Sequence, residues 1–192
     1  DRRLQVDQLQ ADKVVLTPGP PTEKPPGEPL RSVALPIDIE LPFDVREIVW
    51  AAASPVTVTG LAGHYRYAEH SHGLRLDGVE VADGRYQGQL TLQGAAPMAL
   101  TAALRGTVTA PMAEGVAPLV VQADADVQGT LSNPEGRLVV KARSAPAAGS
   151  DDPMRATLDA EIAPWAAQPV VRAQGDFTRI DAARFWPTAP RT

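Results

Sequence analysis

Cysteine is absent from all 192 residues, which excludes disulfides, thiolate nucleophiles and thiolate metal sites together. Aromatic residues make up only 5% of the chain, although hydrophobic residues reach 44%, so much of the apolar content is Ala, Val and Leu. The chain also holds 19 prolines and 15 glycines. Small apolar side chains with frequent Pro and Gly suit many short strands joined by turns, not a compact, aromatic-rich enzyme core.

Long hydrophobic runs and clusters of positive charge are also missing. No stretch approaches the roughly 18 consecutive apolar residues that a membrane-spanning helix needs. The formal net charge is -5 with Lys and Arg scattered, so charge gives no reason to expect nucleic acid as a partner. Because the chain begins at Asp1 and not at Met, we expect a piece of a longer protein, with any signal or anchor outside it.

Prolines concentrate in one segment near the beginning of the chain, where residues 18–29 read PGPPTEKPPGEP. This density forbids helix and interior strand, so we expect a proline-rich loop or linker over 18–31. It separates an opening strand pair at 1–17 from a continuous β segment at 32–192. A ligand for a proline-recognition domain is the other interpretation of such a run, although an inserted loop is commoner.

Apolar and polar residues alternate with period two along most of the remaining chain, the pattern of strands with one buried face. A helix would scatter these sets around its circumference. The phase of the alternation shifts near Gly78, which predicts a β-bulge there. The one helical candidate is a single turn at 181–185. The clearest alternating segments are 35–41, 84–93, 98–108, 119–131 and 154–162.

Strands of this length with one apolar face must have that face covered. A closed sandwich would cover it, and so would a curved sheet whose apolar side forms a groove filled by something else. Periodicity alone is compatible with both arrangements.

Four segments carry a family resemblance. They read RRLQVDQLQADKVVLTP, LPIDIELPFDVREIVW, GLAGHYRYAEHSHGLRLDGVEVADGRYQGQLTLQGAAPMALTAALRG and WAAQPVVRAQGDFTRIDAARFWPTAPR. In their paired strands, glycine turns and "P-M-x-L-x-A-x-L-x-G" strand they resemble the N-terminal half of the TamB family, and more broadly the AsmA-like proteins. These are patterns of strand and turn and include no catalytic signature.

The resemblance implies an all-β fold, an elongated, curved, antiparallel-type sheet (a U-shaped β-taco) of many consecutive strands with minimal helix. It implies a bridge-like lipid transporter, whose apolar groove carries phospholipid acyl chains through the periplasm between the inner and outer membranes. The parent would be anchored in the inner membrane and would meet a TamA-like outer-membrane barrel through regions outside this chain. A structural or chaperone-like β module that assists outer-membrane protein insertion by strand addition is the alternative.

Within this interpretation thirteen apolar residues are candidates for lining the groove. The same residues would form the core of an ordinary sandwich. They are Tyr86, Leu90, Leu92, Met98, Leu100, Leu104, Leu119, Val121, Val127, Leu131, Met154, Leu158 and Ile162.

Candidate chemistry is sparse, and we expect neither an enzyme nor a cofactor. His70 and His72 could place two imidazoles on one side of a strand, but EHSHG reads as a solvated hairpin turn and no third ligand follows. The pairs Asp151/Asp152 and Asp124/Asp126 read as a turn and a solvated polar face, so a carbohydrate-active β-helix enzyme lacks its acid–base pair. No phosphate loop or nucleophile elbow is apparent. The three tryptophans read as local packing anchors: Trp50, Trp165 and Trp186.

Overall fold

The computed structural model describes residues 3–17, 31–51, 55–110, 118–132, 134–147 and 154–179, which form strands and turns but no helix. The expected proline-rich loop, the turn at 181–185, the pair Asp151/Asp152 and Trp186 lie outside the described residues, apart from the last residue of that loop. The strands are β1 (Arg3–Gln5), β2 (Leu9–Leu16), β3 (Asp38–Trp50), β4 (Val56–Ala68), β5 (Ser71–Val81), β6 (Gly84–Gln93), β7 (Ala99–Ala110), β8 (Leu119–Thr130), β9 (Arg137–Pro146), β10 (Arg155–Ile162) and β11 (Val170–Thr178).

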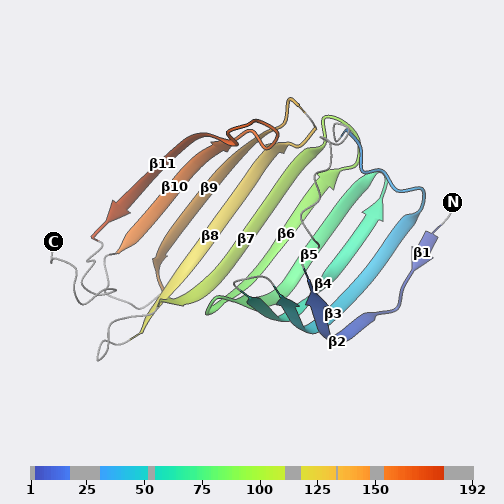
Figure 1. The fold of residues 1–192 in the computed structure, drawn as a ribbon, viewed down its shortest axis with the longest axis horizontal. Coiled ribbons are helices and arrows are strands. Elements are labelled where there is room, and N and C mark those ends of the chain that lie inside the picture. The colour runs from blue at the N-terminus through green and yellow to red at the C-terminus, as the bar shows by residue number, and fades with distance from the viewer. Residues whose placement is uncertain are drawn as a thin grey trace.

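All eleven strands belong to one sheet, laid out side by side in a single layer (Figure 1). From β3 to β11 each strand pairs antiparallel with the next one along the chain. The opening strands β1 and β2 both pair with β3 in parallel and not with each other. The sheet is curved and does not close, so the expected all-β, elongated and curved sheet is confirmed.

The strand boundaries follow the sequence pattern in the middle of the chain. The predicted strand at 84–93 coincides with β6, and the bulge expected near Gly78 is confirmed by a register shift between Leu76 and Val79. The prediction was wrong at its start, because Leu35 and Ile37 precede β3 and belong to no strand. Two hairpins turn on non-glycine residues with positive φ, Glu69–His70 and Ala82–Asp83, as two-residue type I′ turns require.

Residues directly opposite each other in a sheet point to the same side, so the strand register defines transverse rows of side chains. Three such rows cross the sheet on one side, which we name the apolar face. The rim row is Leu4, Ile39, Tyr67, His72, Leu92, Leu100, Gly129, Leu138, Ile162 and Val170. The second row is Leu41, Tyr65, Leu74, Leu90, Ala102, Val127, Val140, Ala160 and Ala173. The third row is Leu9, Phe43, Gly63, Leu76, Gly88, Leu104, Ala125, Ala142, Leu158 and Gly175.

Burial is concentrated at one end of the strands, where the connections β4–β5, β6–β7, β8–β9 and β10–β11 lie; we call this end the rim. Tyr67 and Met98 are fully buried there, and Leu100 and Ala163 are buried as well. A chain segment at 32–37, the strap, crosses the same end. The compact core of this protein is therefore a strip along the rim, and most of the apolar face away from it is only half-buried.

Hydrogen bonds fix the strap to the rim. The Val33 amide donates to the Gly94 carbonyl at 2.8 Å, and the Leu35 amide donates to the Tyr67 hydroxyl at 2.9 Å. Ser32 adds a hydroxyl bond to the same Gly94 carbonyl at 2.9 Å. These bonds explain why Leu35 and Ile37 do not extend β3 in spite of their alternating pattern.

Glycines on the apolar face allow large neighbours to lie across the sheet. Gly106 of β7 stands directly opposite Tyr86 of β6. A Cβ at Gly106 would overlap the Tyr86 ring and come within 2.6 Å of the Arg85 carbonyl oxygen. Leu104 likewise covers Gly88, so glycine and a large residue alternate across the β6–β7 pair.

Gly106→Ala should lower the free energy of unfolding by about 1–3 kcal/mol, because the new methyl group forces either the Tyr86 ring or the β6 backbone to move. Gly73→Ala is the matched control: a Cβ there meets nothing closer than 3.8 Å, and the change should stay within about 0.5 kcal/mol. Urea denaturation of both variants measures the difference. Equal effects at the two positions would contradict the close approach described for Gly106.

Candidate functional site

The apolar face is the feature of this structure with the clearest capacity for binding. Its second and third rows contain no charged side chain from β2 to β11. At about 4.8 Å between neighbouring strands, the nine steps of the third row span roughly 43 Å. Among the described residues no second sheet or helix packs over these rows.

Large apolar side chains on this face remain in contact with solvent. Leu104 is 40% exposed and Leu158 is 42% exposed, although each lies in the third row with a paired strand on both sides. Soluble proteins seldom leave a contiguous apolar strip of this kind open, and such strips usually mark sites of interaction.

Ten of the thirteen predicted groove residues occupy strands with their side chains on the apolar face. Tyr86 and Val121 lie on it beyond the third row, where the register sets Tyr86 against Gly106, and Val121 against Val108. Leu119, two residues before Val121, points to the same face by alternation and is buried at the start of β8. The other seven fall in the three rows: Leu90, Leu92, Leu100, Leu104, Val127, Leu158 and Ile162.

The remaining three predicted residues lie outside the strands. Met98 is fully buried in the β6–β7 connection and Leu131 directly follows β8, so both belong to the rim. Met154 directly precedes β10. Their contribution is to the ends of the sheet and not to the open middle of the apolar face.

The opposite face of the sheet is polar and carries ordered charges. Asp124 of β8 lies between two arginines on neighbouring strands, 3.6 Å from Arg105 and 3.3 Å from Arg143. These pairs occupy one transverse row, Gln87–Arg105–Asp124–Arg143–Thr157, and are largely solvent-exposed. Exposed pairs of this kind contribute little stability, and their charged groups remain in contact with water on the polar face.

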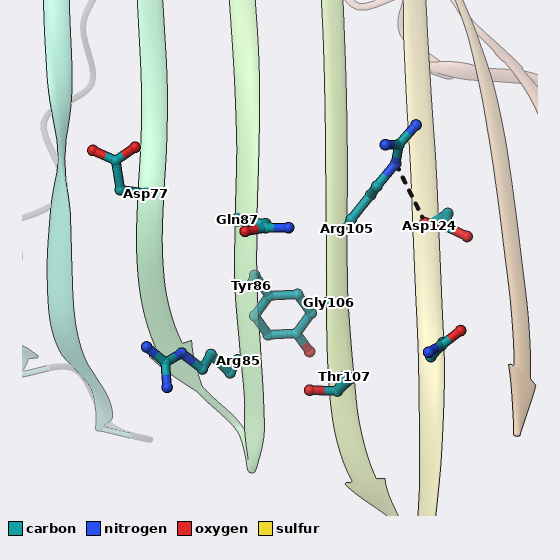
Figure 2. A pocket seen from close by; sticks show the side chains of 9 residues that line it. Asp77, Arg85, Tyr86, Gln87, Arg105, Gly106, Thr107 and Asp124 are labelled. Carbon is teal, nitrogen blue, oxygen red and sulfur yellow. Dashed lines mark ion pairs between the residues drawn. The ribbon is translucent and has the colours of Figure 1, made fainter. Parts of the chain in front are cut away.

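A shallow hollow of about 380 Å³ lies on this polar side (Figure 2). Side chains from four neighbouring strands surround it, among them Asp77, Arg85, Gln87 and Arg105, and the Arg105–Asp124 ion pair borders it. Its opposite charges are balanced and it is open to solvent. We therefore assign no ligand to it, and no cluster of metal-binding side chains occurs among the residues that the structure describes.

The histidines behave differently from the solvated turn that the sequence suggests. His70 does lie in the β4–β5 turn, but His72 is half-buried inside β5, on the rim row, and its prediction as a turn residue was wrong. Its Nδ1 lies 2.7 Å from the Tyr65 hydroxyl and its Nε2 lies 2.8 Å from the Val33 carbonyl oxygen. Because a carbonyl only accepts, Nε2 carries a proton, so in the neutral ring Nδ1 accepts from Tyr65.

His72 thus holds the strap together with Tyr67 of the same rim row, a role that alternation could not reveal. The register sets His72 against Tyr67, and their ring centroids are 4.6 Å apart. Asp124 was expected as a solvated residue of the polar face; it does lie on that face, held by its two arginines. Trp165 donates to the Leu131 carbonyl at 2.7 Å and anchors the β10–β11 connection against β8.

No protein-family model, curated protein or solved structure matches this chain. Within the described part of the chain, no helix is long and apolar enough to span a membrane. The resemblance to the TamB family therefore remains a prediction from the sequence.

Burial raises the pKa of the Tyr65 hydroxyl above its ordinary value of 10.0, and the neighbouring Tyr67 adds to the shift. The unfolded chain therefore loses this proton at a lower pH than the folded protein, so the stabilisation is complete below about pH 10 and is lost as pH rises. The unfolding free energy of the Tyr65→Phe variant should therefore fall less steeply with pH than that of the wild type, between about pH 9 and pH 11. Urea denaturation across that range measures both slopes, and identical slopes would contradict the assignment.

Proposed function

We propose that this chain is a periplasmic segment of a bridge-like lipid transporter, related to the TamB family, and that its apolar face holds phospholipid acyl chains. The observation that carries the proposal is the pair of uncharged rows, which cross nine and ten strands without a covering layer among the described residues. An acyl chain along such a row exchanges water contact for apolar contact at every methylene, a gain of about 0.8 kcal/mol each.

The composition of the rows favours movement along them over tight binding at one point. The residues are mainly Leu, Val, Ala and Gly, so the surface offers similar apolar contact at each strand and no deep pocket. The only titratable side chains in the three rows, His72, Tyr65 and Tyr67, lie towards the strap. From β6 to β11 the second and third rows contain only aliphatic residues and glycine.

Within this proposal the rim and the polar face have separate tasks. The rim holds the fold together through its buried residues and the strap, while the charged rows of the opposite face remain in water. Phospholipid headgroups would stay outside the apolar rows, in contact with solvent. In the parent protein, contact with a TamA-like outer-membrane barrel would be made by regions outside this chain.

A second candidate is a β module that assists outer-membrane protein insertion by adding a client strand to the sheet. One observation favours it: β11 is exposed along its whole length and pairs only with β10 among the described residues. Strand addition would use backbone groups at that edge and leave the apolar rows unoccupied. If lipid binding is lost after changes in the apolar rows but not after changes at the β11 edge, the result therefore favours the lipid function over strand addition.

Replacing Leu104 and Leu158 together with Asp should abolish co-purification of phospholipid, a fall of roughly tenfold or more, because it places two charges in the third row. Native mass spectrometry of the purified chain, followed by lipid extraction, gives the amount and identity of the bound lipid. Both side chains are already partly exposed, so the fold should survive, and circular dichroism checks this.

The control carries the same charge on the other side of the sheet. Val120→Asp with Val139→Asp changes two residues that are 42% and 47% exposed on the polar face of β8 and β9. This variant should keep its lipid. A wild-type chain free of lipid, or equal losses in the two double variants, would contradict the proposal.

A further inference from the structure

The edge formed by β11 differs from a typical protected sheet edge. Monomeric proteins usually protect their edges with short strands, proline, lysine or bulges that turn the edge away. The β1 and β2 side has two of these features, since β1 has three residues and β2 carries the exposed Lys13. In contrast, β11 is a nine-residue strand without proline or lysine, at the far end of the sheet (Figure 1).

The sequence of β11, VVRAQGDFT, is complementary to itself when it runs antiparallel to a second copy. With Gln174 opposite the same residue of the second copy, Arg172 faces the other copy's Asp176, and the reverse pair forms by symmetry. Val171 then faces Phe177, and Ala173 faces Gly175. Opposite charges and apolar pairs directly across an antiparallel strand pair are each stabilising.

Only this register pairs the charges. A shift of two residues in either direction sets Arg172 opposite Gln174 or Thr178, and a shift of one residue places polar side chains on the apolar face. Within the described residues of the single chain, Arg172 lies opposite Glu161 of β10, and its guanidinium donates to the Gln174 side-chain oxygen at 3.2 Å. The exposed Phe177, at 69%, and Val171, at 55%, would both gain a neighbour.

We propose that the β11 edge binds the β11 edge of a second copy of this chain, forming a two-fold symmetric dimer with one continuous sheet. The symmetry is closed, so the contact produces dimers and not filaments. It also keeps the two faces aligned: the third row, ending in Gly175, continues into Ala173 and the second row of the other copy. The apolar face is thereby extended across the dyad without an intervening charge.

A second copy fits this edge better than an arbitrary client strand, because both charges and both apolar pairs match in the same register. The inference does not depend on lipid binding. It concerns the edge, which the Leu104 and Leu158 substitutions leave unchanged.

Sedimentation velocity of the full chain over a wide concentration range tests the dimer. Arg172→Asp replaces two attractive pairs with two repulsive ones and should raise the dimer dissociation constant roughly tenfold or more. The charge swap that combines Arg172→Asp with Asp176→Arg re-creates both pairs in the same register and should restore dimerisation. Lys141→Asp, the same charge change on the exposed polar side of β9, should leave the constant unchanged.

Circular dichroism of each variant confirms that the sheet is intact before the comparison is made. A wild-type chain that stays monomeric at all concentrations would overturn the proposal. So would a charge swap that fails to restore the dimer, open-ended assembly in place of a dimer, or preferential capture of an unrelated extended peptide at β11.

Discussion

The structure depends on one constraint: in a pleated sheet, residues that face each other across neighbouring strands share a side. Once each strand alternates apolar and polar residues and each hairpin sets its neighbour in register, the apolar residues of ten strands collect into continuous rows. A shift of one residue in any strand would place its charges on the apolar face, so the register is strongly specified. Alternation and register together therefore place aliphatic rows on one face of the sheet and charged rows on the other.

This constraint leaves the protein with an unusual distribution of burial. A sandwich would bury its apolar rows against a second sheet, but the described chain buries its apolar residues mainly at the rim, where Tyr67, Met98 and the strap meet. The part of a strand near the rim is therefore the more buried and stable part, whereas residues further along the strand are more exposed to solvent. Gly106 and Gly88 complete the arrangement, because they allow Tyr86 and Leu104 to lie across the sheet and keep neighbouring strands in close approach.

Much of this fold could be predicted from period-two alternation alone. The strand at 84–93 and the bulge near Gly78 follow from local pattern, because each strand shows its own phase of alternation. The apolar face was predictable for the same reason, and ten of the thirteen candidate residues lie on it. Alternation does not record long-range contacts, so it misplaced Leu35 and Ile37, whose strap is held by His72 and Tyr67 from β5 and β4. It also cannot show whether a sheet is covered, and that question separates an open face from an ordinary core.

We propose that acyl chains occupy the apolar rows, and site-resolved photo-crosslinking can locate them there. A phospholipid with a diazirine on its acyl chain is bound to the protein and irradiated, and the labelled residues are mapped by mass spectrometry. We expect labels with period two along β6 to β10, at residues such as Leu90, Leu104, Ala125 and Leu158, and none at the intervening polar positions. Labels distributed equally over both faces, or confined to the ends of the strands, would contradict the claim.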